Sequence, residues 1–579
     1  MAILGVDVGG TFTDAVLLDG RDLHTAKVPT ESRQDESVVA SAAAVGAQDV
    51  ERFTHGTTVA TNALLERKGA RTAFVATAGF EHLLHLRRQN RKHLYRLCEA
   101  HPEPLVPLER CVGVSERIGP EGVLRPLDLD SLPAIDAEAV AVCLLFAFRD
   151  PTHERLVAAE LRRRLPDAHV VASHEVAPEF REYERASTTA ADAYLGPVVS
   201  RYLRALAAAA GAAGLPEPLV LRSSGGVATL EDVAAHPAFA LVSGPAGGAV
   251  GASLIARRAG FPDAISFDMG GTSTDVCLVV GGAVARATER EVGGLPIRLP
   301  TVDVHTVGAG GGSIAWRDRG GALQVGPQSA GAYPGPACYG RGGTEPTVTD
   351  ANLLLGRLPE QLAGGLVLDR SAAERALGDL DPADVVRVVN AEMLRALRVV
   401  SVERGHDPRD FALVAFGGAG PLHACDLADE LGIATVLVPR DAGVLSALGL
   451  VSGEERRDHV RSYVVPLDDA GELPVVGEAD LRYAGQSFEL PVALGPDLAE
   501  RFHRAHEERY GYADRRRPIE LVAIRTADVR PAPTVELPPG DPLDVSGPAV
   551  LELAGASCWI PPGWVGARDG YGTLILTRR

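Results

Sequence analysis

A short motif that occurs twice constrains the fold of this chain more than any other feature. Residues 5–14 read GVDVGGTFTD and residues 266–275 read SFDMGGTSTD, and the two copies agree at six of ten positions. Each copy follows an apolar run and leads into another, which predicts two β-strands joined by a Gly-Gly turn. Because a repeat this far apart in the sequence indicates two similar domains, we expect the two hairpins to lie on opposite walls of one cleft.

The turn of this motif has the chemistry of a phosphate site. Backbone N–H groups of a Gly-Gly turn can approach an anion because no Cβ intervenes, and an acid on each side can hold a cation or its waters. One copy alone is also typical of an ordinary β-hairpin. Two copies favour a Mg–nucleotide site gripped from both sides. The expected phosphate ligands are Gly9, Gly10, Thr11 and Thr13 in the first copy and Gly270, Gly271, Thr272 and Ser273 in the second.

Composition places the chain among globular proteins of several domains. It has 579 residues, of which 46% are hydrophobic and 23% are charged. The net charge of −19 argues against nucleic-acid partners and anionic membranes, because non-specific binding to either needs a basic face. No apolar run approaches the roughly 18 residues of a membrane span, and the N-terminus lacks the features of a signal peptide. We therefore expect a cytoplasmic protein.

Cysteine and lysine usage exclude several other classes of site. The seven cysteines include no CxxC pair, so neither a disulfide framework nor a zinc ribbon is indicated. Cys338 has no adjacent base, which favours a structural thiol over a nucleophile. The chain contains only three lysines and no GxxxxGK[ST] motif, which excludes a P-loop.

Two histidines are candidates for chemistry, each with a structural alternative. Asp303 and His305 are two apart on a predicted strand over residues 302–307, so they face the same side. They could share a metal ion or form a structural Asp–His hydrogen bond. His55 lies in a polar, glycine-containing turn before a predicted helix. It could position substrate or phosphate, or it could be a turn histidine whose hydrogen bonds are satisfied.

Three further glycine-rich segments are candidate anion or nucleoside sites. Gly310 and Gly311 belong to a loop over residues 308–313 that suits phosphate or ribose. Residues 417–421 follow a predicted strand and precede a predicted helix. Residues 243–260 are expected to enter a helix at about Gly247, where the glycines could bind an anion or permit close helix packing.

The paired hairpins resemble the phosphate-1 and phosphate-2 loops of the actin, sugar kinase and Hsp70 ATPase superfamily. Longer blocks resemble the hydantoinase A family, which includes hydantoin-hydrolysing subunits, the matching half of 5-oxoprolinase and a subunit of acetone-type carboxylases. The resemblance runs from about residue 3 to 450 and then resumes in pieces. The blocks that carry it are residues 54–80, 241–252, 305–316, 335–358 and 413–424.

This resemblance implies an α/β fold with two actin-like ATPase (ribonuclease H-like) domains around a nucleotide cleft, followed by a β-rich C-terminal domain. The expected boundaries are 1–185 for the N-terminal domain, 186–455 for the central ATPase domain and 456–579 for the C-terminal domain. Two stretches of the C-terminal region are shorter than is usual in the family. The chain is therefore expected to be a compact member.

The resemblance also implies an activity, the ATP-dependent opening of a cyclic amide or imide of the hydantoin or 5-oxoproline type. Phosphorylation of the carbonyl oxygen would activate the ring. Asp7 and Asp268 would bind Mg²⁺ or orient the acceptor, and His55 would lie near the first phosphate loop. The metal candidates for Mg²⁺ or another divalent ion are Asp7, Asp268, Asp303 and His305. The residues expected to seat adenosine are Gly417, Gly418 and Ala419.

Partners and rival functions follow from the same family. Its A subunit works with a B-type subunit, so we expect a heteromer, and hence an oligomer. One alternative is a subunit of an acetone-type carboxylase, in which ATP would activate bicarbonate or a ketone enol. Another is a nucleotide-dependent binding protein without catalysis, as Hsp70 is within the superfamily.

Overall fold

Two sheets with the same strand order form the centre of the computed structural model, which describes residues 2–31, 33–96, 99–362 and 365–579. Each sheet contains three antiparallel strands that are consecutive in the sequence. Two later strands run parallel to the first of these three. This is the ribonuclease H-like order that the family resemblance implies, and the expected fold class is confirmed. The first wall contains β3 (Asp22–Pro29), β2 (Phe12–Asp19), β1 (Ala2–Val8), β4 (Val50–Gly56) and β10 (Leu219–Leu221). The second wall contains β14 (Ala283–Val284), β13 (Thr274–Val280), β12 (Ala264–Met269), β24 (Ala412–Phe416) and β25 (Thr435–Val438).

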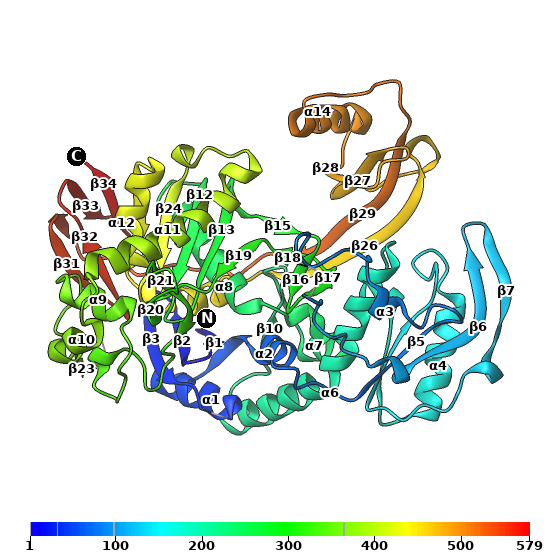
Figure 1. Cartoon of the computed structure of the whole chain (residues 1–579), viewed down its shortest axis with the longest axis horizontal. Helices are drawn as coiled ribbons and strands as arrows, with labels where there is room; N and C mark the ends of the chain where they lie inside the picture. Colours follow the sequence, from blue (N-terminus) through cyan, green and yellow to red (C-terminus); the bar gives the residue numbers. More distant parts are fainter. Residues whose placement is uncertain (1, 32, 97–98, 363–364) are drawn as a thin grey trace.

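Two helices rich in small residues lie between the walls (Figure 1). These are α8 (Ser243–Arg258) and α13 (Leu445–Val451). A Cβ atom on Gly449 would lie 2.0 Å from the carbonyl oxygen of Gly247, and one on Gly5 would lie 2.5 Å from that of Ala447. The glycines of α8 therefore permit close packing, one of the two roles predicted for them. The helix begins at Ser243, four residues before the predicted entry.

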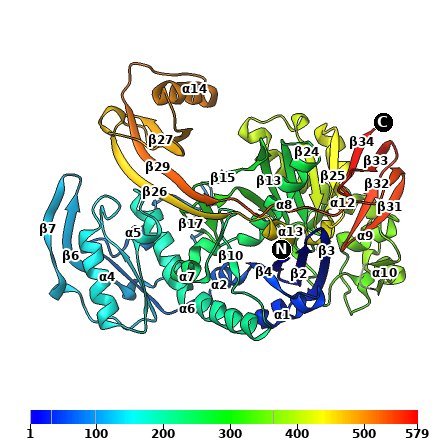
Figure 2. The same cartoon turned by 180° about the vertical axis from the view of Figure 1, so that it is seen from behind.

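A separate five-stranded sheet is inserted between β4 and the long helix α6 (Glu182–Ala212). It lies at one end of the molecule, and α6 runs from it back to the first wall (Figures 1 and 2). Its strands are β7 (Gly122–Asp128), β6 (Cys111–Gly119), β5 (Thr72–Thr77), β8 (Ala139–Cys143) and β9 (His169–Ala172), and α4 (Thr152–Arg164) packs on it. Between β5 and β6 the described residues form one α-helix, α3 (Leu83–Leu86), and residues 97–98 fall outside the described part of the chain.

The C-terminal region extends both walls. β26 (Glu455–Pro466) and β29 (Ile519–Arg530) form a long ribbon that joins the first-wall sheet through β11 (Val227–Ala228). At the other end of the region, β34 (Leu574–Arg578) pairs with β25 and covers the edge of the second-wall sheet. The first-wall sheet thus runs across residues 185 and 455 and the second-wall sheet across residue 455, and the division into three domains stays a prediction.

A further helix, α14 (Leu498–Tyr510), precedes β29 in the chain. None of the helices described is long and apolar enough to cross a membrane.

Candidate functional site

The two copies of the motif have the same backbone geometry. Asp7 lies opposite Asp14 in the β1–β2 pair, and Asp268 lies opposite Asp275 in the β12–β13 pair. The N–H of Gly9 donates to the carbonyl of Phe12 at 2.9 Å, and the N–H of Gly270 donates to that of Ser273 at 3.0 Å. The sequence repeat is therefore a structural repeat, with one pair of facing acids at the end of each hairpin.

Each turn leaves two backbone donors unused. The N–H groups of Gly10, Thr11, Gly271 and Thr272 make no hydrogen bond to any residue that the structure describes. A Cβ atom on Gly10 or Gly271 would meet nothing within 4 Å, so both turns are open. These four donors have the arrangement that a phosphate group requires on each wall.

The second threonine of each motif is buried, which differs from the phosphate-binding role predicted for Thr13. Thr13 is fully buried, and its hydroxyl pairs with that of Thr30 at 3.0 Å. The matching Thr274 is also buried and donates to the carbonyl of Ala309 at 2.6 Å. Both hydroxyls anchor the hairpin inside the protein, which leaves the Thr13 side chain unsuited to bind phosphate.

A glycine beside each first acid makes room for its carboxylate. A Cβ atom on Gly56, at the end of β4, would lie 2.3 Å from Oδ1 of Asp7. One on Gly417, directly after β24, would lie 2.3 Å from Oδ1 of Asp268. Sequence analysis did not single out Gly56, although its place at the end of a strand neighbouring β1 was a signal for it. It assigned Gly417 to adenosine, whereas the structure places this residue beside Asp268.

The acids at the hairpins interact unfavourably in their ionised forms. Burial, with a further contribution from the charge of Asp14, raises the pKa of Asp7 to about 7. Burial also raises the pKa of Asp268 to about 8, with contributions from the charges of Asp275 and Asp7. Because Asp268 responds to Asp7, the two walls bring their acids together. Desolvated carboxylates that repel each other favour a bound cation.

The second acids of the two hairpins have different partners. Asp14 accepts a hydrogen bond from Nζ of Lys27 at 2.6 Å, and the same ammonium group donates to the carbonyl of Gly443 on the second-wall side at 2.9 Å. Asp275 accepts from Oγ1 of Thr306 at 2.5 Å. Burial raises the pKa of both Asp14 and Asp275, and these partners oppose the rise. Sequence analysis missed Lys27, although it is one of only three lysines.

The predicted loop over residues 308–313 supports the second hairpin from behind. The N–H of Gly310 donates to Oγ of Ser313 at 2.8 Å, and the N–H of Gly311 donates to the carbonyl of Gly270 at 3.0 Å. A Cβ atom on Gly310 would lie 2.7 Å from the backbone of Gly271. Neither N–H is free for phosphate or ribose, so the geometry favours a supporting role for Gly310 and Gly311.

Part of the predicted adenosine loop is also engaged. The N–H of Gly417 donates to the carbonyl of Ala442, and the N–H of Ala419 donates to that of Met269, both at 2.9 Å. The N–H of Gly418 has no partner among the described residues. Of the three residues, Gly418 therefore keeps a donor for a ligand.

His55 lies in strand β4, not in a turn, and no part of it is exposed. Its Nδ1 is 3.1 Å from the carbonyl of Val6, and its Nε2 is 2.8 Å from the hydroxyl of Tyr202. Burial lowers its pKa to about 4. With both nitrogens occupied by protein, the geometry favours the structural alternative over a catalytic role.

Asp303 and His305 do not form the pair predicted for them. Both nitrogens of the Arg404 fork bind Asp303, with one bond at 3.0 Å. His305 lies in β19 (Val304–Val307), opposite Val276. Within the described ranges, no three or more His, Cys, Asp or Glu side chains are grouped to hold a metal ion. These observations favour a structural ion pair at Asp303.

Cys338 is fully buried, and burial raises its pKa. It is therefore a structural thiol, as the sequence indicates.

Models of known families match most of the chain. A family model described as hydantoinase/oxoprolinase matches residues 185–459, and one described as the hydantoinase/oxoprolinase N-terminal region matches residues 3–165. The chain is 33% identical to the alpha subunit of caprolactamase from Pseudomonas jessenii, with 99% of both chains covered. It is 35% identical to the gamma subunit of acetophenone carboxylase from Aromatoleum aromaticum, over 77% of this chain and 67% of the relative.

Solved structures extend this similarity to the whole fold. The crystal structure of the ATP-dependent caprolactamase from Pseudomonas jessenii has a TM-score of 0.87 at 32% identity, and all of both chains is covered. The nucleotide-free structure of acetone carboxylase has a TM-score of 0.78 at 23% identity, which shows a shared fold. The alignment with the caprolactamase subunit runs over 686 residues, whereas this chain has 579, so the relative carries segments that this chain lacks.

Proposed function

This chain belongs to the hydantoinase/oxoprolinase family, and on that premise we propose that it is the ATP-dependent subunit of a cyclic amide hydrolase. The observation that carries the proposal is the pair of matching hairpins, each with two unused N–H donors and a desolvated acid. The N–H groups of Gly10 and Thr11 would hold phosphate oxygens of ATP from one wall. Those of Gly271 and Thr272 would hold them from the other.

The acids fit a magnesium ion. Mg²⁺ prefers oxygen ligands, keeps several waters and takes only one or two carboxylates beside the phosphates, so it needs no cage of three protein ligands. Asp7 and Asp268 supply such oxygens. Burial destabilises the ionised form of each carboxylate, and a bound cation would offset that cost. When bound, the ion would neutralise charge on the phosphates.

An amide resists hydrolysis because its nitrogen is a poor leaving group. Phosphorylation of the carbonyl oxygen by ATP would make the carbonyl carbon reactive. The ring carbonyl oxygen would attack the γ-phosphorus, and ADP would leave. Water would then add to the activated carbon, and the ring C–N bond would break with a proton passing to the nitrogen. A second water would release phosphate from the resulting acyl phosphate, giving a carboxylate and an amine. Since phosphoryl transfer depends on positioning and charge neutralisation, the hairpins would supply most of what this subunit contributes.

We also propose a B-type partner subunit. The similarity to a protein named as an alpha subunit supports this inference. The hydrolytic steps after phosphorylation would then take place in the partner or at the interface with it.

Phosphate release from Mg–ATP tests the proposal. The chain is assayed alone and with a B-type subunit, with caprolactam, hydantoin or 5-oxoproline added. We expect a cyclic amide to stimulate release, D268N to abolish the stimulation, and D303N, which alters an acid away from the hairpins, to leave it intact. Absence of ATP binding and turnover under all conditions would reject the nucleotide site.

A carboxylase subunit is the second candidate, and the similarity to the acetophenone carboxylase subunit supports it. In that case a ketone with bicarbonate, and not a cyclic amide, would stimulate phosphate release.

A further inference from the structure

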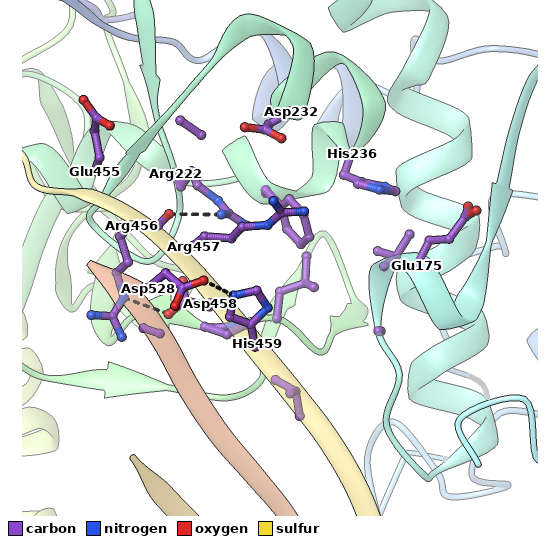
Figure 3. A pocket seen from close by; sticks show the side chains of 18 of the residues that line it. Glu175, Arg222, Asp232, His236, Glu455, Arg456, Arg457, Asp458, His459 and Asp528 are labelled. Carbon is purple, nitrogen blue, oxygen red and sulfur yellow. Dashed lines mark hydrogen bonds and ion pairs between the residues drawn. The ribbon is translucent and has the colours of Figure 1, made fainter. Parts of the chain in front are cut away.

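A cavity lies beside the first wall, where β10 ends. It has a volume of about 820 Å³ and is bordered by β26 and β29 on one side and by the end of β10, α7 (Leu230–Ala235) and the segment before α6 on the other. Figure 3 shows the charged side chains that reach into it. A volume in this range is typical of sites for small organic ligands, which are roughly 300–1,000 Å³.

Arg222 is a buried cation at this cavity without an acidic partner. Only 8% of the residue is exposed, and it forms no ion pair with any side chain in the described ranges. Its Nη1 donates to the carbonyl of Arg456 at 3.1 Å, and its guanidinium lies 4.2 Å from the centre of the Phe239 ring. Burial lowers its pKa, the charges of Asp458 and Asp232 oppose this fall, and the charges of Arg457 and Arg456 add to it. A buried guanidinium in this setting is stabilised by an anion.

Two more groups add positive charge to the same space. Arg457 is exposed and also lacks an ion pair among the residues described, and its side chain extends toward Arg222 (Figure 3). His236, which directly follows α7, lines the same cavity. Burial alone would lower the pKa of His236, but its hydrogen bond to the fully buried Asp192, at 3.1 Å, raises it. This histidine is therefore a third group that can carry positive charge here.

Most of the acids that border the cavity are already paired. Glu179 binds Arg298 at 2.7 Å, Asp458 binds Arg456 at 2.7 Å, and Asp528 lies 2.8 Å from His459. Glu175 pairs with Arg162, and Glu455 with Arg52 and Arg530. Asp232 accepts a hydrogen bond from Thr229 at the start of α7. Arg222 and Arg457 are thus the arginines at the cavity without an ion pair among the described residues, and Asp232 is an acid there without a basic partner.

The cavity also has an apolar part. Phe239, Leu219, Leu299, Pro300 and Val176 line it beside the arginines. Inorganic phosphate would use only the charged part. A ligand with an apolar body and one anionic group would use both.

The position of Arg222 links this cavity to the nucleotide site. β1, β4 and β10 are parallel, and Leu221 is the last residue of β10. Arg222 therefore leaves the same sheet edge as Asp7, two strands away, which is roughly 10 Å. Ligands of parallel sheets bind at this edge.

We propose that this cavity binds a small organic carboxylate, with Arg222 and Arg457 holding the carboxylate and the apolar lining holding its body. The inference rests on the proposed function, which supplies two sources of such a carboxylate. One is a cyclic amide that carries a carboxylate, and the other is the open-chain acid formed from it. The site thereby favours acidic over neutral cyclic amides as substrates. Two guanidinium groups on one carboxylate are a strong and geometrically selective arrangement.

Isothermal titration calorimetry on the whole chain without nucleotide tests the site directly. The probes are 5-oxoproline as a cyclic acid, glutamate and 6-aminohexanoate as open-chain acids, caprolactam as a neutral amide, and inorganic phosphate. We expect at least one of the acids to bind and caprolactam not to bind. R457Q should lower the affinity for that acid by at least about tenfold. Arg457 is exposed and unpaired, so this variant should fold. Tighter binding of 5-oxoproline assigns the cavity to substrate, and tighter binding of an open-chain acid assigns it to product.

R163Q is the matched control, because Arg163 is an exposed arginine paired with Glu160 on α4. It should bind the acids as the unmodified chain does. R222K should retain part of the affinity that R222Q loses, since it keeps the charge without the planar fork. Binding of phosphate alone, no binding of any acid, or equal affinity in R457Q would overturn the inference. Because no nucleotide is present, these results are independent of ATP turnover, whose failure would reject the proposed function and leave the cavity site standing.

Discussion

The two hairpins share their geometry but differ in their electrostatics. Turn, facing acids and neighbouring glycine are the same in both. In the first, however, the second acid is bound by the ammonium group of Lys27, which also reaches across to Gly443. In the second, Asp275 has the neutral hydroxyl of Thr306 as its hydrogen-bonding partner, and the pKa of Asp268 is raised further than that of Asp7. The two copies thus share a backbone geometry, whereas the charged and polar groups around each copy differ.

The largest effect is expected from removing the acids themselves. D268N should lower ATP turnover by about 10³-fold and D7N by about 10²-fold, because acid–base and charge contributions at such sites are typically 10²–10⁴-fold. Asp268 has the larger predicted loss since its carboxylate is the more basic one. Steady-state phosphate release measures both. Equal losses would mean that the hairpins are equivalent in function as well as in backbone.

The glycines beside the acids should come next. G56A and G417A each place a methyl group 2.3 Å from a carboxylate oxygen, so each should reduce turnover by about 10-fold to 10²-fold through displacement of the acid. The two should differ in stability, because Gly417 has φ of +77°, which strains any other residue, while Gly56 does not.

Thermal unfolding beside the kinetics separates the two effects. G417A should lower stability by about 1 kcal/mol or more relative to G56A. G211A, on an open helix surface with nothing within 4 Å, is the control. Full activity in G56A would show that the position of the Asp7 carboxylate is not critical.

Lys27 should set the pH dependence of the first hairpin. Its charge lowers the pKa of Asp7 and Asp14. A cation binds the ionised carboxylates, so turnover rises as pH increases through the pKa of Asp7, which is about 7, and then through the pKa of Asp268, which is about 8 and which the charge of Lys27 also lowers. K27M raises both pKa values and should shift the acidic limb of the pH–rate profile upward by about one unit. T306V removes only a neutral donor from Asp275 and should shift the acidic limb less than K27M does. A larger shift in T306V than in K27M would mean that the second hairpin sets the pH dependence.

The repeat allowed the two hairpins to be predicted, since DxGGTxTD specifies turn and strands through local chemistry, and the family resemblance allowed the fold around them to be predicted. Which side chains face inward was not predictable in the same way. Thr13 reads as a hydroxyl donor for phosphate, yet strand alternation buries it against Thr30. His55 reads as a turn histidine because glycine follows it, but pairing with β1 makes it part of the sheet.

Roles that depend on contacts across the fold were missed or misread for a related reason. Asp303 meets Arg404, which is 101 residues away in the sequence. Gly56 and Gly417 matter through carboxylates on neighbouring strands. Likewise, the charged cavity joins β26 to β10, and spacing along the chain gives no sign of that contact.

The smallest effect concerns the buried threonines and separates anchoring from ligand binding. T274V leaves the buried carbonyl of Ala309 without its donor and should cost about 1–2 kcal/mol of unfolding free energy. T13V should cost less, about 0.5 kcal/mol, because the hydroxyl of Thr30 retains the carbonyl of Gly9 as an acceptor at 3.0 Å. Denaturant titration measures both, and turnover should stay within about twofold of the unmodified chain because neither hydroxyl reaches the ligand. A loss of about 10²-fold in T13V with unchanged stability would instead return Thr13 to the phosphate site. The two threonines would then differ in role, as Asp14 and Asp275 differ in their hydrogen-bonding partners.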